Sequence, residues 1–500
     1  MDKNTVVAYV LILVVLFLMP FYFNIFSPPQ EEPTVQPPAA TDTLTQADRV
    51  IPDTTEQTIA PIDAPESATP TAQESTVKAD TIVVETDDYW LTLSTQGGGT
   101  FTSILLKNYP GPHGEPYAEL VPDRKSHVFS MRAVDFQGDT IDFGKEPFEL
   151  SGFSAASDTL HVESPTPLSF VHTTPEGGVL TRTMTFYPED YHIGLSIQLN
   201  HFRDVISNRR YHLTWNSAIA ITESNAQDDL TYSKSYGLLA DELVDIDAAK
   251  AKPGDPALES IEGRTQWVAV RNKYFTSIIT PVNREAIGMR LVGTKTPTDS
   301  IDIKHYNASI VIPYSENVSQ KDSFFVYIGP LDYDELRSYG QDFQRMMNFG
   351  WKIIRPISKA VLWAFTSIHQ YIPNYGLVLI LFGVVVKILV FPLTKKSYVS
   401  MKSMQNLQPK VQELRDKYKD DQQKMNQEMM KIYKENGVNP MGGCLPMLLQ
   451  MPLLYALFIV FRSTIELRGA EFIGWITDLS QPDTVFTLPF SLPLYGANVN

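Results

Sequence analysis

The chain has a single cysteine, Cys444, among its 500 residues, so no disulfide bond can form within it. It also lacks the short motifs of catalytic and nucleotide-binding sites. It has no Gly-x-Ser-x-Gly, no His-Glu-x-x-His and no phosphate-cradling glycine loop. Its histidines are scattered without metal-ligand spacing, and acidic pairs such as Asp228-Asp229 are more typical of solvated loops than of metal sites. These absences argue against an enzyme and against a bound cofactor or metal.

Positive charge is scarce outside one stretch. The formal net charge is −16, yet residues 394–436 hold ten Lys or Arg and only six Asp or Glu. A protein that binds nucleic acid usually has a dominant basic surface, so no nucleic acid is expected as a direct ligand. One basic segment in an acidic chain is typical of a membrane protein whose basic segment stays in the cytoplasm.

The first 80 residues divide into an apolar part and a polar part. Residues 1–26 contain an apolar run that is longer than that of a signal peptide and is followed by no small-residue cleavage site. An uncleaved transmembrane anchor is therefore expected, with a cleavable signal as the alternative. Residues 27–80 have no aromatic residue and many prolines, which predicts a disordered Pro/Thr-rich linker. Residues 81–86, directly after the linker, are expected to be able to join the next domain.

Short β-rich runs separated by glycine and proline turns occupy residues 81–330. The predicted strands are residues 90–94, 101–106, 179–186, 193–199, 211–215, 267–279, 287–292 and 323–328. No helices alternate with them, so a doubly wound parallel sheet is not expected. The pattern favours one large antiparallel β-sandwich.

A helical segment is expected over residues 331–374, beginning with a helix at 331–347 that starts near Asp332 or Asp334. Residues 349–371 then have the pattern of a basic amphipathic helix lying in the membrane interface, with packing against the β-sandwich as the alternative. Its apolar residues recur at helical spacing and are Trp351, Ile354, Ile357, Leu362, Phe365 and Ile368.

Residues 375–394 and 438–463 are each long and apolar enough to cross a membrane as a helix. The first span has one charge, Lys387, among fourteen large apolar residues. Gly383, one turn earlier on the same face, leaves room for water, so Lys387 is expected to face a wet cavity. The alternative is a lysine that snorkels toward Lys395. The second span contains the polar Gln450.

Between the two spans, residues 395–437 predict a cytoplasmic coiled-coil hairpin. Its seam residues step by three and four positions and are Met404, Leu407, Val411, Leu414 and Tyr418. Pro409 is expected to kink or restart the first helix, and Asn436-Gly437 to end the second. Because positively charged loops stay inside, the hairpin and the N-terminus are predicted to be cytoplasmic. The β-sandwich and residues 464–500 are then predicted to be external.

Three stretches strongly resemble the YidC family of membrane-protein insertases. They are Lys387-Ile-Leu-Val-Phe-Pro-Leu-Thr394, Leu407-Gln-Pro-Lys410, and the run Asn439-Pro-Met-Gly-Gly-Cys-Leu-Pro-Met-Leu-Leu-Gln-Met-Pro452. The matching motif residues are Pro392, Pro409, Asn439, Pro440, Gly442, Gly443, Cys444, Pro446 and Pro452. The order of segments is also similar to that of the Gram-negative members.

The resemblance implies an α-helical, multi-pass protein of the bacterial inner membrane, with a large periplasmic antiparallel β-sandwich and a cytoplasmic helical hairpin. The sandwich would be a supersandwich similar in fold to sugar mutarotases. A hydrophilic groove would receive nascent membrane proteins, with Lys387, Gly383 and Gln450 as its contact residues. The protein would act as insertase and chaperone, alone or with the Sec translocon, and its other partners would be the ribosome and membrane lipids.

The chain departs from the family pattern in two respects. Lys387 stands where members usually have an arginine, so a planar bidentate contact is lost. The family's core has five spans and only two are found here, so the chain is expected to lack the C-terminal spans. Two other functions stay open. A carbohydrate-active enzyme would need a paired histidine and carboxylate in a cleft, and a scaffold that only recruits ribosome or translocon would fit a dry, snorkelled Lys387.

Overall fold

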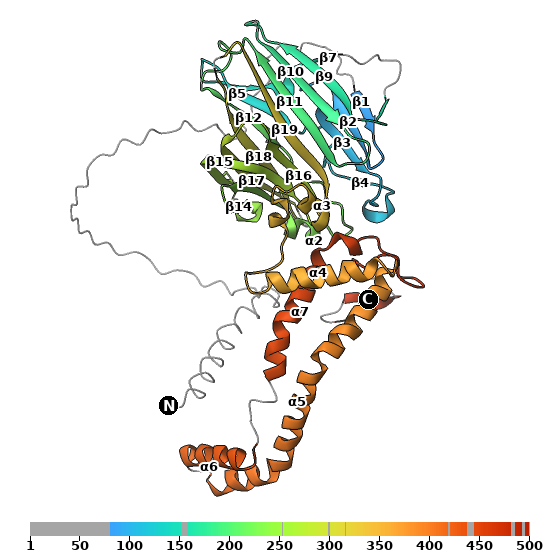
Figure 1. Cartoon of the computed structure of the whole chain (residues 1–500), viewed down its shortest axis with the longest axis vertical. Coiled ribbons are helices and arrows are strands. Elements are labelled where there is room, and N and C mark those ends of the chain that lie inside the picture. The colour runs from blue at the N-terminus through green and yellow to red at the C-terminus, as the bar shows by residue number, and fades with distance from the viewer. Residues whose placement is uncertain are drawn as a thin grey trace, which may run out of the picture. The chain divides into compact units, whose positions relative to one another are not determined.

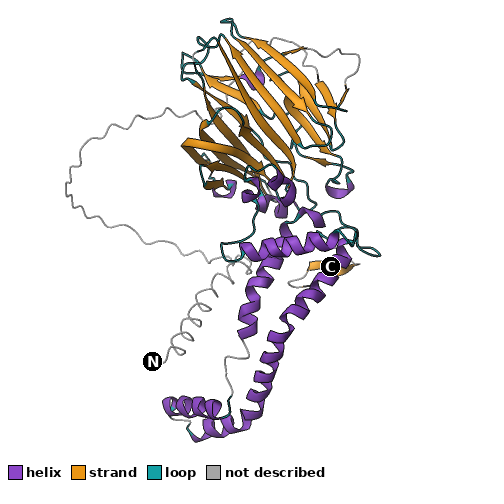
Figure 2. Cartoon of the chain, in the orientation of Figure 1, coloured by secondary structure: helices purple, strands orange, loops and turns teal. Residues whose placement is uncertain are grey.

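The computed structural model describes residues 81–499 with the exception of 152–158, 253, 299–300, 316, 419–420, 438–444, 482–485 and 493–495. The expected anchor and linker, residues 1–80, lie outside the described residues. The described chain begins with strands and continues with helices, as Figure 1 shows by residue number and Figure 2 by secondary structure.

The smaller sheet has five strands in the order β4-β3-β2-β1-β8. Their bounds are β1 Thr81–Glu85, β2 Tyr89–Ser94, β3 Thr100–Leu106, β4 Ala118–Glu119 and β8 Thr159–His161. Strand β1 pairs with β2 along its whole length, so residues 81–85 belong to the β domain (residues 81–330). The pairing of β1 with β8 is parallel, and the other pairings of the described strands are antiparallel.

The larger sheet has fourteen strands and follows the path β6-β5-β12-β18-β17-β15-β16-β19-β11-β10-β9-β7, with β13 and β14 beside β15. Their bounds are β5 Ser130–Val134, β6 Thr140–Asp142, β7 Glu149–Ser151, β9 Thr166–Thr173, β10 Val179–Phe186, β11 His192–Asn200, β12 Arg210–Trp215, β13 Lys234–Leu239, β14 Glu242–Ile246, β15 Ala257–Arg271, β16 Phe275–Pro281, β17 Ala286–Pro297, β18 Asp302–Pro313 and β19 Ser319–Pro330.

One hydrophobic core joins the two sheets. Strands β10 and β11 alternate strictly between buried and half-buried residues, as expected where one face of a sheet is covered. From the smaller sheet, Phe101 stacks on Phe129 with ring centroids 5.1 Å apart and lies 6.0 Å from the ring of Trp215 in β12. All three side chains are almost fully buried. The large antiparallel β-sandwich expected from the sequence is therefore present.

Two predicted elements in this region differ from the structure. The run 267–279 is not one strand, because the chain turns between β15 and β16 at residues 272–274. The side-chain oxygen of Asn272 accepts hydrogen bonds from the backbone N–H groups of Tyr274 and Phe275, at 3.1 and 2.8 Å. This Asx turn needs neither glycine nor proline, and the surrounding apolar run concealed it.

The helix predicted over residues 331–347 is also wrong. Asp332 does cap a helix, α3, but α3 spans only Tyr333–Ser338. Gly340 and Asp342 follow with positive φ angles of 68° and 59°, and this left-handed backbone cannot continue an α-helix. The chain then forms the short 3-10 turn η4, Phe343–Met346.

The remaining helices are α2 Ala226–Tyr232 in the β domain, followed in the C-terminal part by α4 Arg355–His369, α5 Tyr375–Lys417, α6 Gln422–Glu435 and α7 Leu445–Ser463. Short 3-10 turns and a terminal strand pair complete the described elements: η1 Pro112–Gly114, η2 Phe143–Lys145, η3 Ala248–Lys250, η5 Ile465–Leu467, β20 Phe486–Leu492 and β21 Gly496–Val499. Figure 1 shows α4 lying across the N-terminal end of α5 and the C-terminal end of α7.

Helix α5 combines the first predicted span and the first arm of the predicted hairpin in 43 residues. It contains Pro392 and Pro409 without interruption, so the helix does not restart at Pro409. The return arm, α6, ends as expected: Gly437 has a φ of 64°, and its N–H donates to the carbonyl of Lys434.

Candidate functional site

Helix α5 carries the one stretch, among the residues described, that is long and apolar enough to cross a membrane. This stretch, Tyr375–Pro392, has a mean hydropathy of 2.4, and only 17% of it is buried. Bulky side chains such as Ile388 and Leu389 are exposed, as is typical of a lipid-facing surface. In α7, Gln450–Ser463 is a shorter apolar helix. The second span therefore stays a prediction.

Lys387 is an exposed side chain about 18 Å along α5 from Tyr375, at 1.5 Å per residue. At about 100° per residue, Gly376, Gly383, Lys387 and Thr394 lie within about 40° of one another on one side of the helix. A methyl group placed on Gly383 would meet no atom within 4 Å. Within the described chain Lys387 has no ion pair. The charge thus lies beside open space rather than against a carboxylate.

Helices α5 and α7 meet through apolar side chains on another side of α5, about 100–140° around the helix from Lys387. The rings of Phe382 and Phe461 are in edge contact, with centroids 6.3 Å apart and planes at 82°. Val386, directly before Lys387, packs in the same cluster as Leu453 of α7. Gln450 is half-buried one turn before Leu453. No hydrogen bond among the described residues joins Gln450 to Lys387, so the structure places them on neighbouring helices without bringing them into contact.

The family motif residues fall into two groups. Pro392 and Pro409 lie within α5, and Pro446 and Pro452 lie within α7. The others lie outside the described residues and are Asn439, Pro440, Gly442, Gly443 and Cys444.

The hairpin formed by α5 and α6 has the seam that its sequence predicts. Leu407 and Val411 are 6% and 8% exposed. The other predicted seam positions of both arms are half-buried, and they are Met404, Leu414, Tyr418, Met425, Met429, Ile432 and Tyr433. The residues between them are mostly exposed and polar, so a polar outer surface with an excess of positive charge surrounds the apolar seam.

Helix α4 packs its apolar side against the other two helices. Val361, Leu362 and Phe365 are buried in clusters that include residues of α5 and α7. On the outer side, Trp363 is 71% exposed. The predicted amphipathic pattern is therefore present, with the correction that Trp351 is exposed and stacks on Tyr455 of α7 at 5.0 Å.

Charged side chains at the end of α7 contact the β domain, and we call this group of contacts the polar seam. Arg462 donates from Nη2 to Oδ1 of Asp228 at 2.7 Å, and Lys273 donates from Nζ to Oδ2 of the same carboxylate at 2.7 Å. Burial tends to raise the pKa of Asp228, but the hydrogen bonds from Lys273 and Arg462 hold it below its usual value. Asp228 is therefore a carboxylate at neutral pH, held by two cations.

A second ion pair of the polar seam is almost completely buried. Arg468 donates from Nε to Oε1 of Glu223 at 2.6 Å, and the two side chains are 3% and 4% exposed. The guanidinium group also donates to the carbonyl oxygens of Pro110 and Thr222 and lies over the ring of Phe275. Buried pairs of this kind fix geometry more than they add stability, since desolvation offsets much of their attraction.

Two further carboxyl groups have pKa values raised by burial, so a large fraction of each is protonated at neutral pH. Burial raises the pKa of Glu466, next to the polar seam, to about 7, although Thr464 donates a hydrogen bond to it. Burial, followed by the charge of Asp332, raises the pKa of Glu335 in α3 to about 8. Keeping these groups protonated avoids an unpaired buried charge.

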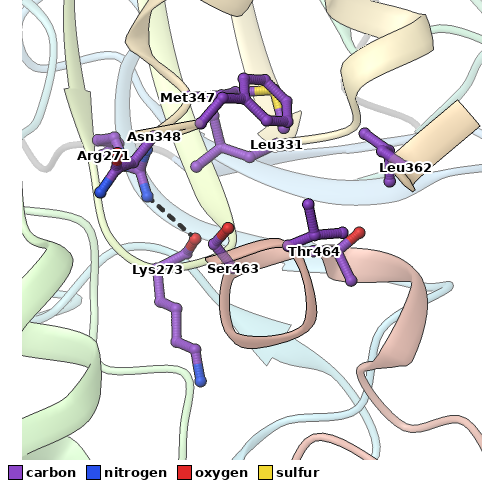
Figure 3. A pocket seen from close by; sticks show the side chains of 10 residues that line it. Arg271, Lys273, Leu331, Met347, Asn348, Leu362, Ser463 and Thr464 are labelled. Atoms are coloured by element: carbon purple, nitrogen blue, oxygen red, sulfur yellow. Dashed lines mark hydrogen bonds between the residues drawn. The ribbon is translucent and has the colours of Figure 1, made fainter. Parts of the chain in front are cut away.

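A small cavity lies where the β domain meets the helices. Figure 3 shows Arg271, the last residue of β15, and the backbone of Lys273 on the side of the cavity next to Ser463 and Thr464. The guanidinium of Arg271 donates to the carbonyl of Lys273 at 3.2 Å. The cavity volume is about 10 Å³, enough for about one water molecule and too small for an organic ligand.

Sequence reasoning missed the polar seam. The interpretation of Asp228-Asp229 as a solvated loop is wrong, because Asp229 is 1% exposed and accepts hydrogen bonds from the backbone N–H groups of Thr222 and Lys273. The available signal was the pair Arg462 and Arg468 at the predicted outer end of a span, where positive charge is depleted. Among the described residues no group of His, Cys, Asp or Glu is arranged to hold a metal ion.

An apolar exposed helix joined to a large β-sandwich defines the class: an integral membrane protein with an extramembrane β domain. Residues 81–364 match the family model described as YidC periplasmic domain, and residues 367–496 match the one described as 60Kd inner membrane protein. The chain belongs to the YidC family of membrane protein insertases, which are inner membrane proteins.

Full-length relatives support the family assignment. The chain is 35% identical over 503 residues to the membrane protein insertase YidC of Chlorobaculum parvum, which covers 100% of this chain and 83% of the relative. It is 36% identical over 446 residues to that of Chlorobium phaeovibrioides, covering 88% of this chain and 75% of the relative. These relatives are named as insertases and not as catalytic enzymes.

Two solved structures show a distant likeness to part of the chain. A putative aldose 1-epimerase from Escherichia coli K12 matches with a TM-score of 0.31 and 8% identity, over 50% of this chain and 99% of that one. A galactose mutarotase-like protein from Lactobacillus casei matches with a TM-score of 0.31 and 9% identity over the same shares. Scores this low carry no argument about fold or activity.

Proposed function

We propose that this protein inserts nascent integral membrane proteins into the bacterial inner membrane and assists their folding, alone or with the Sec translocon. Polar parts of a client would pass along a hydrophilic groove on the Lys387 side of α5. The observation that carries the proposal is Lys387 itself: an exposed cation inside an apolar span, with no ion pair among the described residues and beside the open space at Gly383. A charge at the centre of a spanning helix costs about 2.5–3.5 kcal/mol, so an intramembrane lysine points to a function.

The role proposed for Lys387 is electrostatic and not catalytic. A unit charge about 8 Å away in a medium of effective dielectric constant ~20 contributes about 2 kcal/mol. This attraction would lower the barrier for an acidic client segment that leaves water. Segments without charge would gain little from it.

The test is a charge series at Lys387, measured as insertion of clients into proteoliposomes. Lys387→Arg should keep activity, because charge and approximate reach are retained. Lys387→Ala should slow clients with acidic translocated segments by up to about 30-fold, the rate equivalent of about 2 kcal/mol. Lys387→Glu should slow them further, since it repels the same segments.

Purely apolar clients are the internal control for this series and should insert at nearly the wild-type rate in all variants. Normal insertion of every client by both Lys387→Ala and Lys387→Glu would contradict the proposal. Lys387 would then be a snorkelling anchor, and the scaffold function would be favoured.

We further propose that the β domain is periplasmic and that the hairpin and the N-terminus are cytoplasmic. The support is the excess of positive charge in residues 394–436. The basic outer surface of the hairpin would then face the ribosome or the translocon. In a Cys444→Ser background, cysteines at the exposed positions Glu176 and Lys424 should react with an impermeant reagent from opposite sides of the membrane. Labelling of both from the periplasmic side would contradict this topology.

A further inference from the structure

The segment after α7 forms a small, well-defined turn, which we call the Trp475 hairpin (residues 470–479). Leu479 donates from its backbone N–H to the carbonyl of Ala470, and Phe472 to that of Ile476, both at 3.1 Å. Gly474 has a φ of 69°, and this left-handed residue allows the chain to reverse within a few residues. The tip of the hairpin is Ile473-Gly474-Trp475.

The base of the Trp475 hairpin is fixed to the first turn of α5. Asn374, which caps α5 by accepting a hydrogen bond from the N–H of Leu377, donates from Nδ2 to the carbonyls of Phe472 and Glu471 at 3.1 and 3.4 Å. The ring of Phe472 lies directly against Gly376, where a Cβ would overlap it. The base is therefore level with the start of the candidate span, Tyr375–Pro392.

The tip is apolar and exposed although its base is packed. Ile473 and Trp475 are 70% and 69% exposed. Burying a large apolar side chain contributes about 1.5–3 kcal/mol, so two of them on an anchored turn are an unsatisfied apolar surface. Tryptophan is the residue that favours the membrane–water boundary, since its ring is apolar and its N–H can bind water or headgroups.

We propose that the tip of the Trp475 hairpin is a membrane anchor, in which Ile473 and Trp475 enter the headgroup–acyl boundary at the N-terminal end of α5. The proposal rests on the proposed insertion function only in that α5 spans the membrane. The tip is expected to contact lipid because it is fixed to the end of a lipid-facing helix. Glu471 and Asp478 flank the tip, so the contact is apolar and not an attraction to anionic headgroups.

The anchor would hold the N-terminal end of α5 and the polar seam at a fixed depth relative to the membrane surface. Arg468 of the polar seam directly precedes the segment that forms the hairpin, and Gly469 donates to Oδ1 of Asp478 at its base. A fixed tip would thereby limit the tilt of α5 and of the face that carries Lys387.

The test uses tryptophan fluorescence of the full-length protein in phosphatidylcholine vesicles. The difference between wild type and Trp475→Phe isolates the emission of Trp475 among the six tryptophans. Acyl chains brominated near the headgroup should quench most of this emission, and aqueous iodide should quench little of it. Trp90→Phe is the matched control: its difference emission comes from strand β2 of the β domain and should be insensitive to brominated lipid.

High salt should leave the lipid quenching of Trp475 unchanged, since an apolar contact is not screened. Loss of quenching in salt would overturn the apolar mode of contact. Quenching by iodide and not by lipid would place the tip in water, and quenching by neither would place it under protein; both results overturn the proposal. Client insertion by the Lys387 variants is a separate measurement. If brominated lipid did not quench Trp475 while the Lys387 variants inserted clients as predicted, the membrane anchor alone would be contradicted.

Discussion

Gly376 and Gly383 are two glycines on the same side of α5 with opposite surroundings. At Gly376 an added methyl group would overlap the Phe472 ring, whereas at Gly383 it would meet nothing within 4 Å. Gly376→Ala should therefore destabilise the protein by about 1–3 kcal/mol through overpacking. Gly383→Ala should be neutral or slightly stabilising, because alanine favours a helix more than glycine does.

Thermal unfolding of the two variants in detergent, followed by circular dichroism, measures this difference. Gly376→Ala should melt several degrees below wild type, since about 1 kcal/mol corresponds to about 2–4 °C in a domain of 150–250 residues. Equal melting temperatures for both variants would show that Phe472 does not pack against α5 as described.

For single residues, the sequence predicts local features of a helix but not contacts between distant parts of the chain. The exposure of Lys387 and the open space at Gly383 depend only on local spacing along one helix, whereas the water-filled cavity expected beside Lys387 stays a prediction. Arg462 and Arg468 bind carboxylates that lie 234 and 245 residues away in the sequence, those of Asp228 and Glu223. Such pairs depend on how the β domain meets α7, and no local pattern encodes that.

At the scale of elements, the hairpin of α5 and α6 depends on its buried seam. Val411→Asp would place a charge at a position that is 8% exposed, at a cost of several kcal/mol unless the arms separate. The neighbouring Gln412→Asp puts the same side chain on the exposed side. Trypsin should cleave the hairpin of Val411→Asp at least about 10-fold faster than that of wild type. Destabilising the closed hairpin by about 1.4 kcal/mol already raises the population of the open form tenfold.

Gln412→Asp is the control for added negative charge and should be cleaved at the wild-type rate. If both variants were cleaved equally fast, α5 and α6 would not be held together by this seam.

Some helices and strands could be predicted from the sequence and others could not, for physical reasons. Strand β10 has the bounds predicted for it, Val179–Phe186, because it alternates strictly along its whole length. Strand β18, Asp302–Pro313, was missed because its first half is polar and partly exposed and only its second half is continuously buried. The α3 region was predicted as too long a helix because left-handed residues such as Asp342 carry no strong sequence signal.

At the scale of the whole molecule, the described chain links a β-sandwich to an apolar helical part through the polar seam. The ion pair of Arg468 and Glu223 is buried and costs desolvation energy, so its value lies in fixing how the end of α7 meets the β domain. On α5, Lys387 is one charged side chain within an otherwise apolar exposed surface. The proposed insertion function requires that clients follow the side of α5 that carries Gly383 and Lys387 and not the opposite side.

Site-specific photo-crosslinking tests this directly, with a photoreactive amino acid placed on either side of α5 while a nascent client is being inserted. Gly383 lies on the Lys387 side of α5, and Leu381, about 160° around the helix from Gly383, lies on the opposite side. We predict that position 383 forms strong adducts with the client while position 381 reacts mainly with lipid. Client adducts at 381 that equal or exceed those at 383 would contradict a client path along the Lys387 face.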